Sequence, residues 1–92
     1  MNNLLKLRKD IDVCDRELIH ILSQRFHLVK KVALYKKAHK LKPLDSKRWQ
    51  EVVNTVFSLA DKKIIPKKFI QSFLNLIHKE SLSIEKSIHS KD

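Results

Sequence analysis

The chain of 92 residues has no glycine, only two prolines and one cysteine. Without glycine there is no glycine-rich loop to bind a nucleotide phosphate, and tight β-hairpin turns are disfavoured. The single cysteine, Cys14, excludes an internal disulfide and a cysteine-based zinc site. Few helix-breaking residues and 42% apolar content together favour an all-α fold.

Long hydrophobic runs are also lacking. No segment approaches the ~20 apolar residues that a membrane span requires, and the first residues hold no apolar core of a signal peptide. Together with the lone cysteine, this predicts a cytoplasmic protein. A chain of this length is expected to form a single domain that covers residues 1–92.

Positive charge is the main excess in the composition. Lysine and arginine total 20 against 10 acidic residues, which gives a net charge of +10. Such a charge favours an anionic partner, namely nucleic acid, an acidic membrane surface or a polyanionic small molecule, although a solvated lysine-rich surface explains it equally well. Arginine is scarce, and the chain has four: Arg8, Arg16, Arg25 and Arg48.

Residues 3–40 contain neither proline nor glycine and predict one long amphipathic helix. Apolar side chains recur there, mostly at three- and four-residue intervals, at positions 4, 7, 11, 14, 18, 21, 28, 32 and 35. A helix of ~35 residues is ~52 Å long, whereas a compact domain of this size has a radius of gyration of only ~12 Å. The remaining chain is too short to cover the helix, so we expect a second copy to do so, in an intertwined homodimeric helical bundle.

Two shorter helices are expected to follow. Apolar positions 49, 52, 53, 56, 57 and 60 predict the second helix, and positions 69, 70, 73, 74 and 77 predict the third. We expect the second helix to have its N-cap at Asp45 or Ser46 and to end at residues 61–63, with lysines in its last turn. We expect the third helix to have Pro66 in its first turn and to be followed by a frayed tail from Ser87.

Polar residues occupy several positions at which the helical pattern predicts apolar ones. Arg25 lies on the apolar face of the first helix, and Lys36 lies on the same face, eleven residues or ~16 Å further along. A buried arginine needs a counter-charge, which a structural salt bridge or a ligand carboxylate would supply equally well. Ser81 and Glu85 continue the apolar face of the third helix, unless they belong to a solvated last turn. The histidines form no metal-binding or catalytic pattern, and we expect them, His78 included, on the surface.

Three segments carry a resemblance to a known family. The first helix reads LLKLRKDIDVCDRELIHILSQRFHLVKKVALYKK, the second begins with DSKRWQEV, and the third ends with HKESLSIEKS. Over about residues 4–86, the chain resembles the all-helical, type II class of chorismate mutases. Three of the four arginines fall on family positions, as does the lysine that follows the second of them by eleven residues: Arg8, Arg25, Arg48 and Lys36.

The resemblance implies that the chain rearranges chorismate to prephenate in one pericyclic step, as a homodimer and without a metal or cofactor. Arg8 would cross into the partner's site. The implied catalytic residues, by position, are Lys36, Glu85 and Arg25. The implied substrate-binding residues are Arg8, Arg25, Lys36, Asp45, Arg48, Trp49, Ser81 and Glu85.

Two positions depart from the family pattern. Glu85 stands where many bacterial members have glutamine, and an ionised carboxylate cannot donate a hydrogen bond to the ether oxygen of chorismate. We therefore expect Glu85 to work in its protonated form, with activity that is higher at acid pH. Trp49 stands where the typical member has a glutamate that holds the ring hydroxyl, and an indole cannot accept that hydrogen bond.

Because of Trp49, related substrates stay open, namely isochorismate for a pyruvate lyase and 4-amino-4-deoxychorismate for a mutase. Alternatives of a different class are a basic helical dimer that binds nucleic acid and an inactive regulatory or dimerisation module. No helix-turn-helix is recognisable, and the basic residues are spread along the chain. We therefore expect a chorismate mutase with no membrane or nucleic-acid partner.

Overall fold

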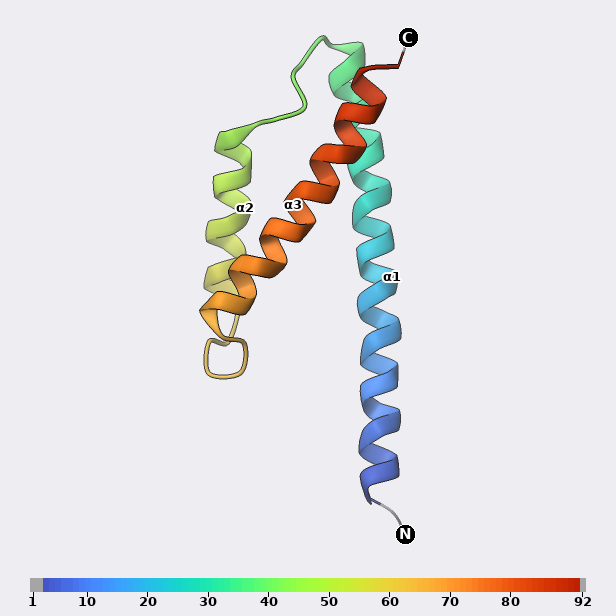
Figure 1. Cartoon of the computed structure of the whole chain (residues 1–92), viewed down its shortest axis with the longest axis vertical. Helices are drawn as coiled ribbons and strands as arrows, with labels where there is room; N and C mark the ends of the chain where they lie inside the picture. The colour runs from blue at the N-terminus through green and yellow to red at the C-terminus, as the bar shows by residue number, and fades with distance from the viewer. Residues whose placement is uncertain (1–2, 92) are drawn as a thin grey trace.

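The computed structural model describes residues 3–91 of the chain, and within this range it contains three α-helices and no strand (Figure 1). They are α1 (Asn3–Ala38), α2 (Ser46–Leu59) and α3 (Lys67–His89). The predicted all-α fold, with one long and two shorter helices, is confirmed. Of these helices, none has the length and apolar content needed to cross a membrane.

Helix α1 is much longer than the other two helices. It has 36 residues, and the structure measures 59 × 25 × 15 Å with a radius of gyration of 16.9 Å. Helix α3 packs against the C-terminal part of α1 and against α2, while the N-terminal half of α1 projects beyond both (Figure 1). The long projecting helix predicted from the sequence is therefore present.

The projecting part of α1 exposes a row of apolar side chains, which we call the N-terminal apolar face. The exposed fractions of its leucines and isoleucines range from 49% to 59%, and Cys14 is also exposed. A surface helix of a globular protein normally turns such a row of side chains toward the core. Nothing in the described chain folds back over this face. Its residues are Leu7, Ile11, Cys14, Leu18 and Ile21.

The core forms where α3 crosses α1. Ile70, Leu74 and Ile77 are spaced by four and three residues, which places them on one face of α3. Ala33 of α1 is also buried, and its small side chain allows the two helices to approach closely. The same face of α3 continues past this core and becomes polar, because the next buried residues are Ser81 and Glu85, at 8% and 9% exposure.

The connections explain how a chain without glycine ends its helices. After α1, Lys40 takes a left-handed conformation with φ of 57°, the position that glycine usually fills. The Leu41 N–H then donates to the carbonyl of Lys36 at 2.7 Å and closes the helix end. Asp45 is the N-cap of α2, as predicted, and its carboxylate accepts from the Arg48 N–H at 3.0 Å.

Three predicted boundaries are wrong. Helix α2 ends at Leu59 because Ala60 is extended, so residues 61–63 form a turn and supply no lysine to the last helical turn. Pro66 is the N-cap of α3 and lies just before its first turn. The expected frayed tail from Ser87 is instead helical to His89, where the Lys37 Nζ donates to the carbonyl of Ile88 at 3.1 Å.

Candidate active site

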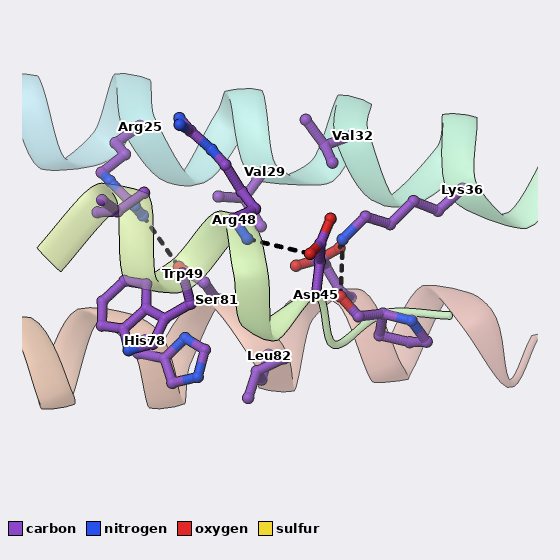
Figure 2. A pocket seen from close by; sticks show the side chains of 13 residues that line it. Arg25, Val29, Val32, Lys36, Asp45, Arg48, Trp49, His78, Ser81 and Leu82 are labelled. Carbon is purple, nitrogen blue, oxygen red and sulfur yellow. Dashed lines mark hydrogen bonds and ion pairs between the residues drawn. The ribbon is translucent and has the colours of Figure 1, made fainter. Parts of the chain in front are cut away.

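A cavity of about 180 Å³ lies among the three helices, and Val29 and Val32 of α1 line it between Arg25 and Lys36 (Figure 2). Three cationic and two carboxylate side chains line it, together with a hydroxyl, an imidazole and an indole. The lining residues are Arg25, Val29, Val32, Lys36, Pro43, Asp45, Arg48, Trp49, Val52, His78, Ser81, Leu82 and Glu85.

Arg25 reaches from α1 toward α3, where its Nη1 donates to the Ser81 Oγ at 3.0 Å (Figure 2). Burial lowers the pKa of Arg25, and the nearby positive charge of Arg48 lowers it further. Among the residues that the structure describes, no carboxylate lies within ion-pair distance of this guanidinium. The structural salt bridge that the sequence left open is therefore absent from the described chain, and the neutral serine leaves the charge uncompensated.

Lys36 lies on the same side of the cavity, as its position on α1 predicts. Its Nζ donates to the Glu85 Oε1 and to the Pro43 carbonyl, both at 2.7 Å. Both side chains of the Lys36–Glu85 ion pair are largely buried, with 18% and 11% exposure. An ammonium has three N–H donors, so one of them remains for a ligand in the cavity.

Helix α2 contributes the polar residues at the outer side of the cavity. The Asp45 carboxylate already serves as the helix N-cap, and the Arg48 Nη1 lies 3.5 Å from the Glu51 Oε1 in an exposed pair. An exposed ion pair of this kind contributes little to stability. The Arg48 guanidinium can therefore exchange this contact for a ligand anion at small cost.

Trp49 and His78 stack across the gap between α2 and α3, with ring centroids 4.0 Å apart and an angle of 14° between the planes. The prediction of His78 on the surface is wrong, because the residue is half-buried and lines the cavity. Burial lowers the pKa of His78, Glu85 opposes this shift, and Arg25 adds to it. The spacing 74, 78, 81, 85 on α3 was the signal in the sequence that could have placed this histidine inward.

A comparison with known protein families gives a match over most of the chain. A model of the chorismate mutase type II family matches residues 7–86. The chain belongs to this family. A bifunctional chorismate mutase/prephenate dehydratase from Buchnera aphidicola is 29% identical over 85 residues, which cover 92% of this chain and 23% of that protein. The chain thus spans about a quarter of the length of that relative. No solved structure matches the chain significantly.

The family match includes every residue that the sequence marked as a site candidate. Seven of these residues line the cavity: Arg25, Lys36, Asp45, Arg48, Trp49, Ser81 and Glu85. Arg8 does not, since it is exposed on the projecting half of α1 and does not belong to the cavity of its own chain.

The stack offers a direct spectroscopic test, because Trp49 is the only tryptophan in the chain. A protonated imidazole against an indole face changes its emission more than a neutral one. We predict a change in Trp49 fluorescence with a midpoint below pH 6.5, the ordinary value for histidine, because burial lowers the pKa of His78. His78→Phe should remove the change. A midpoint at or above 6.5 would contradict the effect of burial on His78, and a change that persists in the variant would show that it does not arise from the stack.

Proposed function

We propose that this chain is a chorismate mutase, which rearranges chorismate to prephenate in the cavity among α1, α2 and α3. The observation that carries the proposal is the half-buried Arg25, which has no carboxylate partner in the described chain and lies in the same cavity as Lys36. Chorismate carries two carboxylates on a small carbon skeleton. A ligand carboxylate would supply the missing counter-charge, and an arginine can bind it through two parallel hydrogen bonds.

Positioning is the first contribution that this cavity would make. The rearrangement forms one C–C bond while a C–O bond breaks, and it proceeds when the reacting carbons are held close together. Arg25 and Arg48, which come from different helices, would fix the substrate through its carboxylates. The apolar side chains of Val29, Val32 and Leu82 would pack against its carbon atoms and exclude water.

Electrostatic stabilisation is the second contribution. As the C–O bond breaks, negative charge develops on the ether oxygen, so a donor aimed at this oxygen binds the transition state more tightly than the substrate. The third N–H of Lys36 is suited to this role. Because its other two donors are held by Glu85 and Pro43, the ammonium is already oriented before substrate binds.

Lys36 gives the most direct test of the activity. We expect the purified chain to convert chorismate to prephenate, followed by the loss of chorismate absorbance and by chromatography of the product. Lys36→Gln should lower kcat/KM at least ~100-fold, the usual effect of removing an oxyanion donor. Lys31→Ala, which alters an exposed lysine of the same helix, should stay within about twofold of the unaltered chain. Absence of prephenate with the unaltered chain would refute the proposal.

Glu85 makes the proposed activity depend on pH. An ionised Glu85 would repel the developing charge on the ether oxygen, whereas a protonated one would donate a hydrogen bond to it.

We therefore expect mutase activity to be higher at pH 5 than at pH 7.5. Glu85→Gln keeps a neutral donor at all pH values, so the variant should stay active and lose this dependence. The measurement is a profile of kcat/KM against pH for both proteins. A flat profile for the unaltered chain, or an inactive Glu85→Gln variant, would exclude a protonated Glu85.

A homodimer would complete the site. The N-terminal apolar face is exposed in the single chain, and a second copy packed along α1 would bury it. The same packing would carry Arg8 into the partner's cavity and add one more cation for the dianion. The proposal includes the expectation that residues 1–92 form one domain that works in the cytoplasm.

Mixing two inactive variants tests the shared site. Arg8→Ala and Lys36→Gln should each be nearly inactive alone. In a mixed dimer, one of the two sites would have an intact Lys36 from one chain and an intact Arg8 from the other. Equal mixing after reversible unfolding should therefore restore about a quarter of full activity, since half of the dimers are mixed. No recovery, although mixed dimers form, would place Arg8 outside the partner's site.

A further inference from the structure

The polar side chains of the cavity differ in how fully they are already engaged. The charged groups and the hydroxyl all take part in hydrogen bonds or ion pairs within the described chain. These contacts are Arg25–Ser81, Lys36–Glu85, Arg48–Asp45 and Arg48–Glu51. The imidazole of His78, in contrast, has a ring contact with Trp49, and among residues 3–91 its nitrogens form no hydrogen bond.

The stacking contact fixes how the imidazole can act. Trp49 covers one face of the ring, so the ring nitrogens, which lie in its plane, stay available at its edge. Burial lowers the pKa of His78, so its neutral form predominates at pH 7. A neutral imidazole has one N–H donor and one nitrogen acceptor, which is the pattern that an uncharged hydroxyl can satisfy.

We propose that His78, positioned by Trp49, recognises the uncharged ring hydroxyl of the substrate. This inference rests on the proposed function and identifies a specificity-determining residue for it. The carboxylates of chorismate require cations, and its ether oxygen requires the donor on Lys36. The ring hydroxyl is the remaining polar group. Ser81 is also neutral, but its oxygen already accepts from Arg25, whereas the imidazole nitrogens of His78 can both donate to the ring hydroxyl and accept from it.

Trp49 acts here as a positioning residue. Its indole has an N–H donor but no acceptor, so it cannot replace the imidazole. It holds the imidazole of α3 against α2, and this limits the angles at which the nitrogens meet a ligand. A site that hydrogen-bonds a substrate hydroxyl discriminates against an analogue that lacks it, because the polar groups of the site are then left unpaired.

The test compares chorismate with an analogue that lacks the ring hydroxyl. His78→Phe keeps an aromatic ring against Trp49 and removes both hydrogen bonds. We expect the variant to lose about 10- to 100-fold in kcat/KM for chorismate and to stay within about twofold for the analogue. His78→Gln, which restores a donor and an acceptor, should recover most of the preference for chorismate. His89→Phe, at the exposed end of α3, is the matched control and should change neither value.

The outcomes separate this inference from the proposed function. If the unaltered chain converts chorismate and His78→Phe lowers kcat/KM equally for both substrates, His78 only supports the packing of α2 on α3, and the inference is wrong. It is also wrong if the variant changes neither value, or if His78→Gln fails to recover the preference for chorismate. If the unaltered chain converts neither substrate, the proposed function itself fails, and the inference fails with it.

Discussion

The uncompensated positive charge of Arg25 is the constraint on which the rest of the site depends. Its guanidinium is half-buried between α1 and α3, bonded to a neutral serine and repelled by Arg48. A charge in such a place lowers stability unless a counter-ion is present, and an apolar side chain of similar size would usually serve the fold as well or better. The charge at this position is explained if Arg25 belongs to the proposed binding site, in which a ligand carboxylate would complete the pair.

The other helices are arranged around this charge. The inward face of α3 changes from apolar at Ile77 to polar at Ser81 and Glu85, so one helix both closes the core and supplies the polar wall of the cavity. The Lys36–Glu85 pair keeps a second cation in place without neutralising Arg25. Helix α1 supplies both cations from its C-terminal half, while the apolar face of its N-terminal half is exposed.

The sequence predicted those features that follow from helical periodicity. The three helices follow from three- and four-residue spacing, and the structure confirms them. The family resemblance, and not the spacing, implies that Arg25 and Lys36 share a site with Ser81 and Glu85, and all four line one cavity. The prediction for His78 is wrong because a histidine can face inward without belonging to a metal-binding or catalytic pattern, and His78 lies on the inward face of α3 between Leu74 and Ser81.

The C-terminal end of α3 could not be predicted because it depends on a contact between distant segments. The bond from Lys37 to the carbonyl of Ile88 joins α1 to the end of α3, and no local pattern near Ser87 encodes it. The single chain does not show the role of Arg8 that the family resemblance implies. In the proposed homodimer, its charge would enter the partner's site.

The most direct test of the account is thermal unfolding of the unaltered chain and of Arg25→Met, each with and without saturating prephenate. A ligand that binds only the folded state raises Tm, by several degrees at about 100 times its Kd. The account predicts this rise for the unaltered chain and none for Arg25→Met, which should be at least as stable without ligand because the uncompensated charge is gone. An equal rise in Tm for both proteins would show that Arg25 is not the carboxylate-binding group and would contradict the account.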